Sequence, residues 1–160
     1  MKRYLDSYIY VVLLLLLGTL STQLIAATDA ASSVSVDKPY VRAVPPGQPN
    51  SAAFMTLHNS STSKHSIVRA ESVVSKVVEL HTHVKEDGMM KMRQVKQIDI
   101  PARGKTILKP GGLHVMFLGL KSELKSGEEV TIILIFEDGS KKTIQAPVRK
   151  MKMHMNKPMH

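Results

Sequence analysis

The sequence predicts an all-β protein, folded as an antiparallel sandwich or barrel. Short apolar or alternating runs recur along the 160 residues, and glycine, proline and polar residues separate them. Hardly any stretch places its apolar residues at the spacing of an amphipathic helix. The chain length suits one domain of ordinary size, so a single β domain is expected.

The expected strands begin at residue 34, after a polar lead over 28–33. Turn signals follow several of them, at 45–47, 87–88 and 111–112, where Gly or Pro favours chain reversal. The run 130–138 is apolar on both faces, which places it in the centre of a sheet. The expected strands are 34–44, 51–59, 66–74, 76–84, 89–100, 105–110, 113–120, 130–138 and 141–148.

Residues 1–27 have the pattern of a secretory signal peptide. Lys2 and Arg3 precede an unbroken apolar run, 8–17, and small residues follow it. This run is shorter than the roughly 20 apolar residues that span a bilayer, which disfavours the alternative of an uncleaved membrane anchor. The chain is therefore expected to be exported to a periplasm, with no stable membrane span after cleavage.

A formal charge of +9 and the absence of cysteine narrow the chemistry. Without cysteine there is no disulfide, no thiol redox chemistry and no residue to carry a bacterial lipid anchor. Aromatic residues, on which nucleic-acid bases stack, make up 4% of the chain, so no nucleic-acid partner is expected. Any soft-metal chemistry must use the 10 methionines and 7 histidines.

Histidine and methionine meet in a predicted β-hairpin, "ELHTHVKEDGMMKMRQV". Asp-Gly at 87–88, between alternating runs, is a strong hairpin signal. With a two-residue loop, His83 lies opposite Met92, and His81, His83, Met90 and Met92 share one face. The Cβ atoms of opposite residues are about 4.5–5.5 Å apart, and those of diagonal residues about 7–8 Å. Either His81 or His83 can therefore share a ligand sphere with Met92, and a longer loop would shift the register.

A second pair, His114 and Met116, lies on one face of the expected strand "LHVMFLGL". Thioether sulfur is a soft, neutral ligand that favours Cu(I) over Zn(II) or Cu(II), and it survives an oxidising compartment better than a thiol. A single methionine is more often core filler, as expected for Met55. Two matching His/Met pairs together favour a metal site.

At these residues the sequence resembles the PCu(A)C family of periplasmic copper chaperones. The family pattern is His, ten residues, Met, twenty-one residues, then His-x-Met, and His81, Met92, His114 and Met116 match it without a gap. The flanking sequences agree, including "VRAVPPGQPNSAAFMTLHN" and "IPARGKTILKPGGLHVMFLGLKSELKSGEEV", so that the resemblance covers residues 34–149. It implies a cupredoxin-like Greek-key β-sandwich that holds Cu(I) with these four residues.

The resemblance also implies a role for the copper. It implies transfer to an acceptor protein, typically the copper-A domain of a respiratory oxidase, with a Sco-type thiol protein as a further partner. Many relatives have Met where this chain has His83. His83 therefore joins the site, replaces His81 or supports the site from outside, and Met90 is a similar auxiliary candidate.

The chain ends in "MKMHMNKPMH", beyond the domain expected at 28–149. Residues 150–160 are basic, show no strand pattern and are expected to form a flexible tail. Their Met and His content is far from average usage, which favours a second copper station over a plain solvated terminus. The oxidation state of copper there is open and includes Cu(II). The candidate tail ligands are Met151, Met153, His154, Met155, Met159 and His160.

The leading hypothesis is a periplasmic Cu(I) metallochaperone for a respiratory oxidase copper site, and not an enzyme. Its alternative is copper sequestration for resistance, with the same ligands and no dedicated acceptor. A copper oxidase is disfavoured, because the chain lacks the His-rich set that oxygen chemistry favours and the Cys ligand of blue-copper sites. A plain ligand-binding or adhesion domain would make the His/Met spacing accidental.

Overall fold

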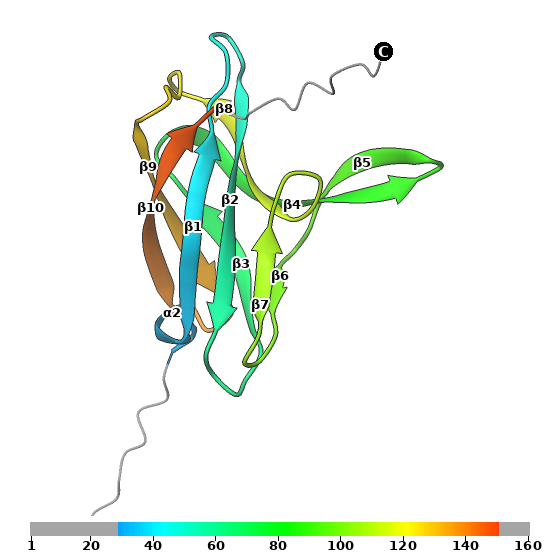
Figure 1. Ribbon diagram of the computed structural model, residues 1–160, viewed down its shortest axis with the longest axis vertical. Helices are drawn as coiled ribbons and strands as arrows, with labels where there is room; N and C mark the ends of the chain where they lie inside the picture. Colours follow the sequence, from blue (N-terminus) through cyan, green and yellow to red (C-terminus); the bar gives the residue numbers. More distant parts are fainter. Residues whose placement is uncertain (1–28, 151–160) are drawn as a thin grey trace, which may run out of the picture.

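Ten strands and one short helix make up the part of the chain that the computed structural model describes, residues 29–150 (Figure 1). The all-β expectation is confirmed. The elements are α2 (Ala30–Ser33), β1 (Val34–Arg42), β2 (Asn50–Asn59), β3 (His65–Glu71), β4 (Ser75–Glu86), β5 (Met89–Gln94), β6 (Ile98–Ile100), β7 (Lys105–Leu108), β8 (His114–Leu120), β9 (Glu129–Phe136) and β10 (Lys141–Arg149).

The strands form two layers of a sandwich that are joined into one continuous sheet. One layer has the order β5-β4-β8-β2-β1, with β7 also pairing with β2, and the other has the order β10-β9-β3-β6. β1 and β10 run parallel where they join the layers, at Val41↔Val148 and Arg42↔Arg149. The doubly apolar strand β9 lies between β10 and β3, which confirms its expected central position.

The hydrophobic core lies between the layers and determines which residues face outward. Phe117 of β8 and Phe136 of β9 are among its largest fully buried side chains, and Met55 is core filler as expected. Fully burying such a side chain contributes about 1.5–3 kcal/mol. Because side chains alternate along a strand, the inward direction of Phe117 turns His114 and Met116 to the outer face of β8.

The hairpin of β4 and β5 projects from the sandwich (Figure 1). Asp87 and Gly88 have φ angles of 53° and 79°, as a two-residue type I′ turn requires. The two-residue loop is therefore confirmed, with His83 opposite Met92 and Lys85 opposite Met90. Among the described strands, β5 pairs only with β4, so it forms the outermost edge of its layer.

Two segments differ from the sequence-based expectation. The expected strand 89–100 is divided, because β5 pairs with β4 in one layer whereas β6 pairs with β3 in the other. The polar lead 28–33 contains the helix α2, whose first two amides donate to Asp138 and Ser140 across the fold. Both differences come from contacts between segments far apart in the sequence.

Within residues 29–150 there is no helix long and apolar enough to cross a membrane. The expected signal peptide, 1–27, and the candidate ligands of the tail, 151–160, lie outside the described residues.

Candidate metal centre

Three neighbouring strands bring the predicted ligands to the outer face of one layer. β4 lies between β5 and β8. His81 pairs directly with His114 of β8, and His83 pairs directly with Met92 of β5. Met116 follows His114 by two residues and therefore lies on the same face. All four motif residues and His83 are thus gathered on one surface.

A cavity of about 280 Å³ opens among these side chains. Its walls include His83, Met92, His114 and Met116, together with Phe54 and Arg42. His81 does not line the cavity but packs beside it, with its ring centroid 5.7 Å from that of His114. The cavity thus contains two thioethers and two imidazoles, and a third imidazole lies at its edge.

The spacing of the imidazole rings suits a shared metal ion. The ring centroids of His83 and His114 are 5.3 Å apart, and those of His81 and His114 are 5.7 Å apart. Two imidazoles on one tetrahedral ion, each with a metal–nitrogen bond of about 2.0 Å, place their centroids roughly 5 Å apart. Either histidine of β4 can therefore complete a site with His114 after a small adjustment.

The described residues contain no larger cluster of histidine and carboxylate ligands. Among residues 29–150, no group of three or more His, Cys, Asp or Glu side chains is arranged to hold a metal ion. The cavity adds the thioethers of Met92 and Met116 to its imidazoles. Such a ligand set favours a soft ion such as Cu(I).

His114 is oriented and kept neutral by its surroundings. It is 2% exposed, and its Nδ1 lies 2.9 Å from the carbonyl oxygen of Gly112. Because a carbonyl can only accept, Nδ1 carries the proton and Nε2 keeps the free lone pair. Burial lowers the pKa of His114, the hydrogen bond to Gly112 opposes this, and nearby His83, His81 and Arg42 lower it further. The ring is thus available as a ligand at neutral pH.

His81 and His83 each keep one ring nitrogen without a partner. Their Nδ1 atoms are buried and form no hydrogen bond among the described residues. Buried polar atoms are nearly always satisfied, so an orphaned one indicates a missing partner. The Nε2 of His81 lies 2.7 Å from a carboxylate oxygen of Glu79. Two buried nitrogens beside His114 are therefore free to bind a metal ion.

The methionines differ in their access to solvent. Met116 is partly buried on β8, whereas Met92 is 42% exposed on β5. Met90 is 59% exposed and lies two residues beyond Met92 toward the hairpin turn, outside the residues that line the cavity. The cavity therefore opens to solvent on the side of the hairpin.

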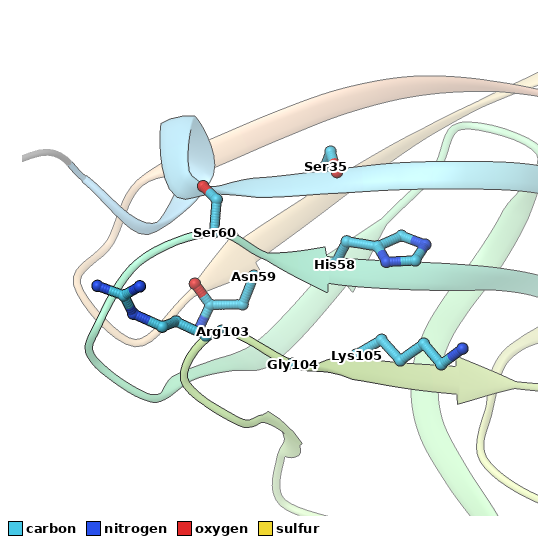
Figure 2. Close-up of a pocket in the computed structure, with 7 residues that line it drawn as sticks. All are labelled: Ser35, His58, Asn59, Ser60, Arg103, Gly104 and Lys105. Atoms are coloured by element: carbon cyan, nitrogen blue, oxygen red, sulfur yellow. The ribbon is translucent and has the colours of Figure 1, made fainter.

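A second cavity, of about 420 Å³, lies near the other end of β2. It is lined by residues that include His58, Arg103 and Lys105, and Figure 2 shows Arg103 pointing away from the other two. The Asn59 amide in its wall donates to the carbonyl oxygen of Ser63, which is a structural contact. The described residues that line this cavity include no methionine and none of the ligands predicted within the sandwich.

Sequence reasoning did not identify Glu79, Arg42 or Phe54 as neighbours of the site. For Glu79 a signal was present, because it precedes His81 by two residues and so shares its face of the strand. Arg42 and Phe54 reach the cavity from β1 and β2. No local pattern in the sequence connects those two strands with the hairpin.

Several solved structures are similar to this chain. "Solution structure of CuI-DR1885 from Deinococcus Radiodurans" is 38% identical, with a TM-score of 0.61, and the match covers 78% of this chain and 85% of that one. "Copper-bound PCuAC domain from PmoF2" is 21% identical, with a TM-score of 0.65, and covers 77% of this chain and 97% of that one. The latter similarity concerns the fold alone, and it confirms the cupredoxin-like β-sandwich.

The comparison with protein sequences identifies the family. "Putative lipoprotein Lxx21020" from Leifsonia xyli subsp. xyli (strain CTCB07) is 34% identical over 120 residues, which are 74% of this chain and 71% of that protein. The model of the LpqE-like family, described as "Putative lipoprotein LpqE-like", matches residues 34–148. These residues include nine strands in full, β10 up to Val148, and all the predicted ligands of the cavity. The chain belongs to the LpqE-like family.

Proposed function

We propose that this protein is a periplasmic copper metallochaperone that holds Cu(I) in the cavity between β4, β5 and β8 and passes it to an acceptor protein. The observation that carries the proposal is the convergence of two thioethers with a buried, oriented imidazole on one open cavity. The 38% identity with the DR1885 protein, which was solved with Cu(I), supports the same cargo. No enzymatic activity is part of the proposal.

The proposed ligands are His81, Met92, His114 and Met116. His114 binds through Nε2, because its Nδ1 is engaged by Gly112. His81 binds through Nδ1, which is buried and has no partner among the described residues. With two neutral imidazoles and two thioethers, the complex keeps the single positive charge of Cu(I). Such soft, neutral coordination stabilises Cu(I) and disfavours Cu(II).

His83 is the alternative fourth ligand. It lines the cavity, lies directly opposite Met92 and also has a buried, unpartnered Nδ1. His81 is preferred because the long-range motif spacing includes it and because the contact with Glu79 orients its ring. In this proposal His83 and Met90 are auxiliary residues beside the site.

Transfer requires that a ligand can be replaced without dismantling the fold. Met92 lies on the exposed edge strand, so an acceptor ligand can approach the ion from that side. Copper stays as Cu(I) throughout, and one neutral ligand is exchanged for another. We propose the copper-A domain of a respiratory oxidase as the acceptor and a Sco-type protein as an additional partner.

An anaerobic titration tests the cargo. Cu(I) is added to the mature protein in competition with a colorimetric Cu(I) chelator, and wild type is compared with the Met92→Leu, Met116→Leu double variant. We expect one high-affinity Cu(I) ion in the sandwich that the double variant loses. Equal affinity in the two proteins would refute the proposed site.

A transfer assay distinguishes delivery from sequestration. The Cu(I)-loaded protein is mixed with a soluble copper-A domain, with and without a Sco-type protein, and the copper content of each partner is measured after separation. Delivery predicts movement of copper to the acceptor. Tight binding without transfer to either partner would favour the alternative of copper sequestration. Cell fractionation checks the periplasmic location.

A further inference from the structure

Glu79, like Glu137 with His65, pairs with a histidine rather than with a lysine or arginine. Glu71, Glu86 and Asp99 each lie within 4.0 Å of a lysine or arginine nitrogen. Within residues 29–150, Glu79 makes no such pair, and its one ionic contact is with His81. Its oxygen lies 2.7 Å from the Nε2 of His81, in a partly buried position. Glu79 is therefore not one half of an exposed ion pair with a lysine or arginine.

The contact determines which nitrogen of His81 carries a proton. An ionised carboxylate can only accept, so Nε2 of His81 donates to Glu79. A second proton on Nδ1 would be buried without a partner, at the cost of an unsatisfied donor. Of the two tautomers, the one with its proton on Nε2 is therefore favoured, and Nδ1 keeps its lone pair.

His114 is fixed in the complementary way. Its Nδ1 donates to the carbonyl of Gly112, so its free lone pair is on Nε2. The two rings lie side by side, since His81 and His114 pair directly across β4 and β8. Glu79 itself pairs with Met116, the neighbouring ligand on β8. One backbone carbonyl and one carboxylate thus orient the two imidazoles of the site.

We propose that Glu79 is a positioning residue for copper: it holds His81 with Nδ1 as the ligand atom and so selects His81 over His83. This role rests on the proposed function. The Nδ1 of His83 has no hydrogen-bond partner in the described part of the chain, and no carboxylate is paired with that ring there as Glu79 is with His81. A carboxylate that accepts from a metal-bound imidazole also makes the imidazole a better electron donor. Its negative charge partly offsets the positive charge of the complex.

Variants of Glu79 in two backgrounds test the role. Glu79→Ala and Glu79→Gln are measured for Cu(I) affinity by chelator competition, alone and combined with His81→Ala. Loss of the supporting residue typically costs 10–100-fold in metal affinity, and we expect a loss of this size for Glu79→Ala. Glu79→Gln keeps an acceptor oxygen and is expected to lose less. In the His81→Ala background, neither change should weaken binding further.

Each alternative role of Glu79 has its own outcome. A loss of equal size in both backgrounds would mean that Glu79 acts on copper directly, through its charge or as a ligand, and would overturn the proposal. Unchanged affinity in Glu79→Ala would overturn it as well. Glu86→Ala is the matched control, because Glu86 is a carboxylate of the same strand that pairs with Arg93 rather than with His81. Its Cu(I) affinity should equal that of wild type.

A measurement on the copper-free protein separates this proposal from the function itself. Nitrogen NMR of the imidazoles should show His81 with its proton on Nε2 in wild type, and a mixture of both tautomers in Glu79→Ala. A wild-type ring protonated on Nδ1 would overturn the positioning role. Wild-type protein that binds no Cu(I) would instead refute the proposed function, and the copper role of Glu79 with it, whatever tautomer the spectrum shows.

Discussion

The two halves of the proposed metal centre are built differently. On β8, His114 is buried, and the residues on either side of Met116, Val115 and Phe117, point into the core. On the hairpin, β4 is the only partner of β5 within residues 29–150, and Met89, Met90 and Met92 are all exposed. One half is therefore held by the packing of the whole sandwich, and the other by a single strand pair. This difference agrees with the proposed function, in which the site binds an ion and releases it to a partner.

The largest losses of Cu(I) affinity and of stability are expected from a change in the buried half of the site. His114→Ala removes a proposed ligand, and it also removes a buried ring with its hydrogen bond to Gly112. Cu(I) affinity should fall by more than about 100-fold, because loss of a residue that only supports a metal ligand already lowers metal affinity by about 10–100-fold. The unfolding free energy of the apo protein should fall by about 1–3 kcal/mol. Chelator competition measures the Cu(I) affinity, and urea denaturation measures the unfolding free energy. An unfolding free energy equal to that of wild type would contradict the view that His114 stabilises this half of the site.

Single methionine changes separate binding from folding in the two halves. Met116→Leu and Met92→Leu should each weaken Cu(I) binding severely, because a sulfur ligand is lost. Leucine roughly conserves volume, so the stability cost should stay below about 1.5 kcal/mol at Met116. It should be smaller at the exposed Met92. If Met92→Leu alone kept the affinity of wild type, the hairpin would have no part in the site.

His81 and His83, both on β4, are expected to differ in their importance for Cu(I) binding. His81→Ala should weaken Cu(I) binding more than His83→Ala, because the contact with Glu79 orients His81 and leaves its Nδ1 free. Both variants are measured by the same competition assay. Loss of binding in His83→Ala, together with intact binding in His81→Ala, would instead assign the fourth ligand to His83.

The pH dependence of folding should trace to the buried half. Burial lowers the pKa of His114 in the folded protein below its ordinary value of 6.5, so between the two values the unfolded chain binds more protons. The contribution of this ring to stability is therefore complete above pH 6.5 and is lost as the pH falls toward the lower, folded-state pKa. Urea denaturation of the apo protein at a series of pH values should show this loss. The loss should be smaller in His114→Asn. An identical pH profile in the two proteins would show that His114 does not cause the pH dependence.

The smallest effect on the fold is expected from residues 151–160. We propose that these Met and His residues bind copper weakly, since wrapping an ion would cost them the entropy of ordering a chain. A tethered site still raises the local copper concentration near the cavity. Deleting the segment should leave the apo melting temperature unchanged and lower the number of copper ions bound per chain. Unchanged copper stoichiometry would leave the segment with no role in metal binding.

Much of the hairpin and of the ligand pattern was predictable because it depends on local chemistry. Asp87 and Gly88 adopt left-handed φ angles that suit few residues other than Asn, Asp and Gly, so two adjacent residues determined the register of His83 and Met92. The alternation of side chains along a strand placed His114 and Met116 on one face. These relations hold over a few residues and need no knowledge of the remaining fold.

The sequence by itself determined the β architecture, the turn and the sharing of faces, whereas only the tertiary structure decided how the proposed ligands are supported. The division of 89–100 into β5 and β6 depends on partners in two different layers. The burial of His114 depends on the folded surroundings of β8, where Phe54 of β2 packs near its ring. Nδ1 of His81 is free because Nε2 contacts Glu79. The alternation of side chains puts the two residues on one face but does not by itself bring them into contact. Burial and hydrogen bonding depend on residues that only the fold brings together. Which nitrogen of an imidazole carries the proton is decided only when all of its possible hydrogen-bond partners are in place.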